Sequence, residues 1–209
     1  MTAHAIFEIL IRYVTKLGIP MERDDVSRLL ESARDGDKGA FDSLIALVYP
    51  ELRRIALSLM RGQINGRTMQ PTAVVNEAWI RLNAGGNTWE NKAHFFGAAA
   101  RAMRQVLTEE ARRRSSQKRA GHMQRVTLQD LVGNTEDPTV DMLALDEALT
   151  ALGEVDERFV RLIELRYFGG CTLEEVAGLT DCSVATVKRD WTYARAWLFE
   201  RLQNVNRSH

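Results

Sequence analysis

The sequence predicts an all-α protein of two small helical domains, joined by a flexible acidic linker and preceded by an extra amphipathic helix. Apolar residues recur at steps of three and four along nearly the whole chain, which is the pattern of helices with one buried face. No segment shows the alternation and turn residues of a β-hairpin. Because the helical period fails between about residues 121 and 141, we expect an extension (1–22), a first domain (23–120), the linker (121–141) and a second domain (142–205).

The extension carries its apolar residues on one helical face between Ile6 and Leu17. We expect a helix there. It would either pack against one of the two domains and hold them closed, or bind a partner.

Three helices are expected in the first domain. The longest follows the apolar steps from Phe41 to Leu59. A second begins near Pro71, because proline suits the first position of a helix, and ends at Gly85. A third starts at about His94 and continues into a run of arginines, so its apolar half can pack while its basic half stays exposed.

The second domain is expected to begin with helices over about 142–152 and 155–167. Thr172 and Glu175 then form a capping box that starts a short helix. After the turn Thr180–Ser183, a longer helix carries its apolar residues on one side. A short helix, a tight turn and a longer second helix are typical of a helix-turn-helix unit, although an ordinary helical hairpin is the alternative.

The outward side of the longer helix is polar and basic near its N-terminus. Such a helix is what reading of the DNA major groove requires. The residues expected to face outward are Ser183, Thr186, Lys188, Arg189, Thr192 and Tyr193.

Charge is unevenly distributed along a chain whose 28 basic and 28 acidic residues cancel. Residues 101–125 hold eight Lys or Arg and two acids, a balance of +6, whereas residues 126–160 hold nine acids and one base, a balance of −8. A basic helix beside an acidic segment fits a polarised nucleic-acid-binding protein, but a charge run alone also fits a solvated helix face.

Composition argues against a membrane protein or a secreted one. No apolar stretch approaches the roughly 18 residues needed to span a bilayer, and the start of the chain lacks the features of a secretory signal. Two cysteines, Cys171 and Cys182, cannot form a disulfide framework. We therefore expect a cytoplasmic protein without a membrane anchor.

An enzyme or a metal site has little support in the sequence. Glu109 with Glu110, and Glu174 with Glu175, are neighbours that point to different helix faces, so neither pair can bracket a substrate. The four histidines are scattered, and we expect the two cysteines to be buried thiols rather than zinc ligands. No cofactor or metal ion is expected.

Three segments, at residues 70–82, 94–104 and 186–198, resemble segments of the ECF-type bacterial sigma factors, in particular of the ECF-like branch. Residues 186–198 (TVKRDWTYARAWL) resemble the DNA-reading helix of that family. Residues 70–82 (QPTAVVNEAWIRL) are similar to the helix that grips the RNA polymerase clamp. Residues 94–104, continuing to the arginines at 112–114, resemble the promoter-melting helix. The resemblance covers about residues 24–204, in order and at the family's spacing.

The resemblance implies a non-enzymatic factor, with sigma domains 2 and 4 as its two domains, that binds core RNA polymerase and lends it specificity for promoter DNA. The six outward residues of the reading helix would recognise the −35 element. Polymerase would be bound by the clamp-like helix, through Val75, Asn76, Glu77, Trp79, Ile80 and Arg81. The −10 element would be held by Trp89, Asn91, Lys92, Arg101, Arg104, Arg112, Arg113, Arg114, Lys118 and Arg119.

Within the −10 set, the arginine tail would bind phosphates, a contact that is independent of sequence and sensitive to salt. The loop over 87–93 would capture an unstacked base, for which Trp89 is either a stacking platform or an ordinary core residue. The linker can reach between the two promoter elements, since 21 residues (121–141) span up to about 70 Å and a spacer of about 17 base pairs measures about 58 Å.

Two positions depart from the family's pattern. Many relatives carry an acid where this chain has Ala73, and the neighbouring Thr72 is either a first-turn residue or a phosphorylation site that restores the charge. Asp190 stands where many relatives have a base, so it either points away from phosphates or accepts a hydrogen bond from a cytosine. Control by a Ser/Thr kinase or by an anti-sigma factor would fit these features.

A helix-turn-helix regulator that does not act as a sigma factor is the alternative function. It accounts for the C-terminal half of the chain. It leaves the clamp-like helix and the basic helix unexplained, and co-purification with core polymerase would separate the two functions.

Overall fold

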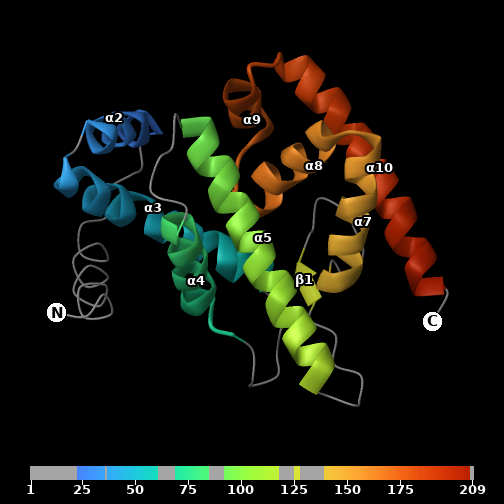
Figure 1. Ribbon diagram of the computed structural model, residues 1–209. Coiled ribbons are helices and arrows are strands. Elements are labelled where there is room, and N and C mark those ends of the chain that lie inside the picture. Colours follow the sequence, from blue (N-terminus) through green and yellow to red (C-terminus); the bar gives the residue numbers. More distant parts are fainter. Residues whose placement is uncertain are drawn as a thin grey trace.

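The computed structural model (Figure 1) describes residues 23–35, 37–60, 69–84, 92–117, 125–127 and 139–207. Helices dominate these residues, which confirms the all-α prediction. The expected N-terminal helix over Ala5–Leu17 lies outside the described residues.

The first group of helices holds the three that the sequence predicted and one that it did not. The predicted helices are α3 (Lys38–Leu59), α4 (Pro71–Ala84) and α5 (Lys92–Gln117). The additional helix is α2 (Arg23–Arg34), which packs on α3 through Val26 and Leu30. Its few apolar residues stand among charges, so its apolar stripe is narrow.

A short antiparallel pairing corrects the prediction of a linker without regular structure. Strand β1 (Arg125–Thr127) pairs with β2 (Thr139–Asp141), with Val126 opposite Val140. Both valine side chains are buried. Strands of three residues are too short to display an alternating pattern, and this explains why the sequence did not reveal them.

The second group consists of α7 (Met142–Val155), α8 (Glu157–Ile163), the π-helix η1 (Glu164–Phe168), α9 (Leu173–Thr180) and α10 (Val184–Arg207). The predicted helix over 155–167 is therefore two elements, because the last turn widens into a π-helix. The chain then turns through Gly170, whose φ of 65° favours glycine.

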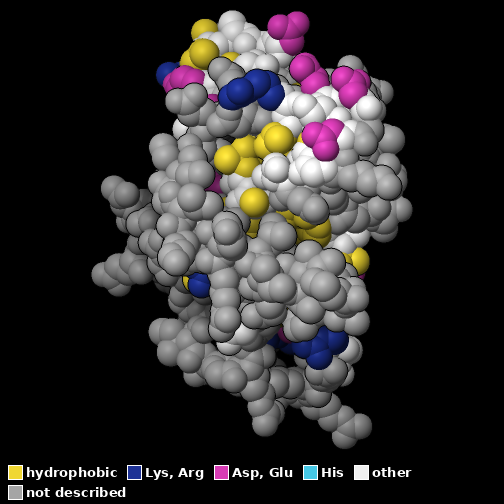
Figure 2. Space-filling view, turned by 90° about the vertical axis from the view of Figure 1, so that its left-hand side faces the viewer, with side chains coloured by type: hydrophobic (Ala, Val, Ile, Leu, Met, Phe, Trp, Pro, Cys, Tyr) yellow, Lys and Arg dark blue, Asp and Glu magenta, His cyan; other side chains and the backbone are white. Residues whose placement is uncertain are grey.

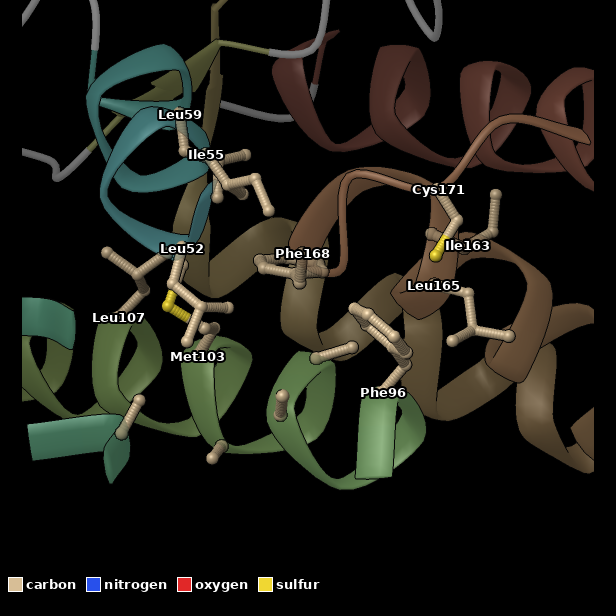
Figure 3. Packing of buried hydrophobic residues seen from close by; sticks show 14 of the residues in the cluster. Leu52, Ile55, Leu59, Phe96, Met103, Leu107, Ile163, Leu165, Phe168 and Cys171 are labelled. Atoms are coloured by element: carbon tan, nitrogen blue, oxygen red, sulfur yellow. The ribbon is translucent and has the colours of Figure 1, made fainter. Parts of the chain in front are cut away.

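The two groups meet along α5, which runs through the middle of the molecule (Figure 1). Helix α5 packs against α4 of its own group and against α7 and η1 of the second. Figure 3 shows Phe168 of η1 directed between α3 and α5, near Leu52, Ile55 and Met103. The division into two domains at residues 121–141 stays a prediction; in this structure both groups contribute to one buried cluster.

The surface mixes charged and apolar side chains. On the face in Figure 2, hydrophobic side chains gather near the middle, with charged ones toward the upper and lower ends. No helix among the described residues is long and apolar enough to cross a bilayer. The described part of the chain also holds no group of three acidic, histidine or cysteine side chains arranged for a metal ion.

Candidate nucleic-acid interface

The helix-turn-helix forms where the sequence predicted it. The Thr172 hydroxyl accepts a hydrogen bond from the Glu175 amide at 3.2 Å, and the Glu175 carboxylate accepts one from the Thr172 amide at 2.7 Å. This reciprocal capping box fixes the start of α9. Asp181 ends α9 in the left-handed conformation, with a φ of 53°, which a short polar side chain tolerates. The turn between the helices is therefore set by local side-chain chemistry.

Of the six residues expected to read the −35 element, Ser183 directly precedes α10 and the other five lie in its N-terminal half, and their side chains do different things. Ser183 and Thr186 bond to each other at 2.9 Å, and Ser183 also accepts from the Thr186 amide. They cap the helix. Thr192 is exposed and donates to the Lys188 carbonyl at 2.9 Å.

The two basic residues of this set project into solvent. Lys188 forms a surface ion pair with Glu174 of α9 at 3.1 Å, and such exposed pairs are weak. Arg189 keeps 75% of its side chain exposed. Val184 and Ala185, which the sequence analysis did not select, are exposed beside them at the start of α10. Small apolar groups in that place can contact the methyl group of thymine.

Asp190 belongs to the packing side of α10 rather than to its outward side. It is 6% exposed, and its carboxylate lies 3.4 Å from Arg158 of α8. This arrangement favours the alternative that Asp190 points away from DNA. Nearby, Tyr193 stacks on Phe159 of α8 with ring centroids 4.9 Å apart, so α8 supports two positions of the reading helix.

The C-terminal half of α5 carries the arginine tail on its surface. Glu110 accepts hydrogen bonds from Arg113 at 2.8 Å and from Arg114 at 2.7 Å. Burial acts to raise the pKa of Glu110, but the two guanidinium groups outweigh it and lower that pKa. These pairs lie within one helix, so they set the direction of the arginines without hiding the exposed Arg113.

Farther back along α5, Arg104 is bound to the second group of helices. Its guanidinium lies 2.9 Å from an Asp146 oxygen and 2.9 Å from a Glu164 oxygen. Arg112 lies 3.0 Å from the other oxygen of Asp146. Burial raises the pKa of Glu164, although hydrogen bonding by Arg104 and the charges of Arg104 and Arg101 act to lower it. No local pattern in the sequence indicates these pairs, because their members are 34 to 60 positions apart.

Helix α4 exposes part of the set expected to bind polymerase. Ile80 is 60% exposed, which is unusual for a large apolar side chain, whereas Val75 is fully buried in the core. Arg81 donates a hydrogen bond to Glu109 of α5 at 2.8 Å, and this bond lowers the pKa of Glu109. Asn76, Glu77 and Trp79 are half-buried. The apolar side chain available to a partner on α4 is therefore Ile80.

The expected −10 residues lie partly inside and partly outside the described part of the chain. Trp89, Asn91, Lys118 and Arg119 lie outside the described residues. Lys92 begins α5, so the predicted loop over 87–93 ends earlier than expected. Arg101 is exposed on α5.

The two free cysteines lie in the second group of helices. Cys171 is fully buried, as the sequence suggested, whereas Cys182 is half-buried in the turn before α10. The Cys171 thiol lies 3.7 Å from the Gly169 carbonyl. The described part of the chain offers these thiols no metal-binding cluster.

In a comparison with protein families, residues 23–204 match the family described as ECF sigma factor. The match covers α2 to α9 and all but the last three residues of α10. No curated protein matches the chain.

Proposed function

The chain belongs to the ECF sigma factor family, and we propose that it binds core RNA polymerase and directs it to promoters with a −10 and a −35 element. Sigma factors of this kind initiate transcription without chemistry of their own. The single observation that best supports promoter reading is the start of α10, where basic and small side chains stand exposed beside a well-capped turn.

Promoter reading would begin with insertion of α10 into the major groove at the −35 element. Arg189 is the strongest candidate for a base contact, because an exposed guanidinium can donate two hydrogen bonds to guanine. Lys188 and Thr192 would contact phosphates or base edges beside it. Asp190 and Tyr193 would hold the helix against α8 through Arg158 and Phe159.

Polymerase binding is proposed for the outer side of α4. An exposed Ile80 beside half-buried Trp79 offers an apolar anchor, and anchors of this kind dominate protein interfaces. Ile80→Glu should abolish most polymerase binding without unfolding the chain, because the side chain already faces solvent. Leu57→Glu, at an exposed apolar position on α3, is the matched control.

The experiment that tests the function is run-off transcription from a genomic library, with core polymerase plus or minus this chain. Transcripts that depend on the chain and on Ile80 would support the proposal and would also identify the promoter. Arg189→Ala should then reduce these transcripts, whereas Arg201→Ala, an exposed arginine farther along α10, should not. A chain that fails to co-purify with core polymerase but binds DNA would instead support the alternative of a helix-turn-helix regulator.

Phosphorylation of Thr72 is a further hypothesis about the polymerase surface. Thr72 is half-exposed in the first turn of α4, which contains no acid. A phosphate there would add a charge of about −1.5 to −2 near a helix N-terminus. Thr72→Glu should bind core polymerase more tightly than Thr72→Ala. Equal binding by the two variants would leave Thr72 as an ordinary first-turn residue.

A further inference from the structure

Two arginines expected to hold the −10 element, Arg104 and Arg112, are instead bound to carboxylates of the second helical group. Arg104 contacts Asp146 and Glu164, both at 2.9 Å, and it also donates to the Asp146 carbonyl at 3.2 Å. Arg112 reaches the second oxygen of Asp146 at 3.0 Å. With its two carboxylate oxygens, Asp146 therefore bridges two arginines that lie about two helical turns apart on α5.

These contacts hide Arg104 from any ligand in solution. The exposed fractions of the side chains are 13% for Arg104, 17% for Asp146 and 9% for Glu164. A side chain held this way cannot reach a DNA phosphate. Arg112, which is 66% exposed, remains partly accessible but already has a carboxylate partner.

An apolar contact beside these ion pairs joins the same two groups. Phe168 is fully buried between α3 and α5 (Figure 3). The turn that follows approaches α3 so closely that a Cβ at Gly170 would lie 2.7 Å from Ile55 Cδ1. The ion pairs thus stand at the edge of a packed core and not at a loose surface contact.

Carboxylate and phosphate oxygens are equivalent acceptors for a guanidinium group. We propose that Asp146 and Glu164 occupy the place of promoter phosphates on α5, so that the face carrying Arg104 and Arg112 binds either this acid pair or DNA. The proposal rests on the function proposed above. It adds an interaction surface whose partner in the free chain is the second helical group itself.

Geometry requires this exchange during promoter binding. The −10 and −35 elements lie about 58 Å apart along the duplex for a spacer of about 17 base pairs. In the structure described here, which we call closed because the two groups of helices are in contact, α5 touches α7 and η1 directly. The groups must separate before both elements are bound, and separation releases Arg104. Because Ile80 is exposed in the closed structure, polymerase can dock on α4 first and then compete for α5.

The test compares two double variants of the full chain with equal charge changes. Asp146→Asn with Glu164→Gln removes the acid pair, and Glu147→Gln with Glu154→Gln removes two exposed acids of α7. Binding of a labelled single-stranded oligonucleotide of mixed sequence is measured by anisotropy over a series of salt concentrations. We expect the first variant to bind about tenfold tighter than the second, with a log–log salt slope steeper by about 0.7 for each phosphate gained.

Equal affinities and equal slopes for the two variants would overturn the proposal. Should the first variant unfold, the single variant Asp146→Asn takes its place, since it removes the charge that faces Arg104 and Arg112 and keeps the shape of the side chain. Small-angle scattering gives a second measurement: removal of the acid pair should increase the radius of gyration, and an unchanged radius contradicts the proposal. Polymerase binding is measured separately. Failure of the proposed sigma function can therefore be distinguished from failure of the proposed competition between the acid pair and DNA.

Discussion

The two helices expected to contact DNA differ in how accessible their basic side chains are. On α10, Arg189 keeps 75% of its side chain exposed, and the side proposed to read DNA is open to solvent. On α5, Arg104 keeps only 13% and is bound to acids from another part of the chain. A basic residue on a helix is therefore not automatically available to DNA, because tertiary packing decides whether its partner is a phosphate or a carboxylate.

The largest expected effect comes from loosening the packing of the second group of helices against α5. Phe168→Ala should lower the free energy of unfolding by about 3–5 kcal/mol, since it empties a fully buried aromatic site. The variant should also bind single-stranded DNA more tightly, because the second group is released from α5. Leu198→Ala, a buried position of α10, should cost similar stability without the gain in DNA binding. Denaturant unfolding and anisotropy check both outcomes.

A smaller effect is expected at the turn that lies against α3. Gly170→Ala should cost about 2–4 kcal/mol, from a left-handed backbone of about 1–2 kcal/mol and from overpacking. Its Cβ would meet Ile55 at 2.7 Å, so Ile55→Ala should cost less in the Gly170→Ala background than alone. The double-mutant cycle is measured by urea unfolding. Strictly additive costs would show that the turn does not press on α3.

Destabilising the helix-turn-helix should leave DNA binding by α5 unchanged. Thr172→Ala removes one half of the capping box and should cost about 1 kcal/mol. Single-stranded DNA binding, which reports on α5, should not change. Thr180→Ala serves as the control, because its hydroxyl bonds a helix carbonyl instead of a cap. A change in single-strand affinity with Thr172→Ala would mean that the two surfaces are coupled.

The smallest expected effect is the pH dependence of the free energy of unfolding that Glu164 contributes, at the contact between η1 and α5. Burial raises the pKa of Glu164 above its ordinary value of 4.5. A carboxyl with a raised pKa in the folded state stabilises that state fully below about 4.5 and loses this contribution as the pH rises through the raised value. The stability of the wild type relative to Glu164→Gln should therefore fall as the pH rises from 4.5. Unfolding curves across this range measure the difference, and a constant difference would contradict it.

Local chemistry explains why much of the fold was predictable. The capping box at Thr172, the proline at the start of α4 and the apolar steps of α3 each act within a few residues. The signals that failed are those that depend on distant partners. The pairing of β1 with β2 brings together residues such as Val126 and Val140, and the widened turn of η1 leaves no mark in the periodicity.

The candidate site divides in the same way. Helical period and capping are local, so the sequence alone predicts that α10 follows a tight turn and presents Arg189 outward. The partners of Arg104 depend on the packing of the helices, because Asp146 and Glu164 lie 42 and 60 positions away. A periodic pattern indicates which side of a helix is buried, but not which helix packs against that side. The second helix supplies the acidic residues that pair with a basic residue such as Arg104.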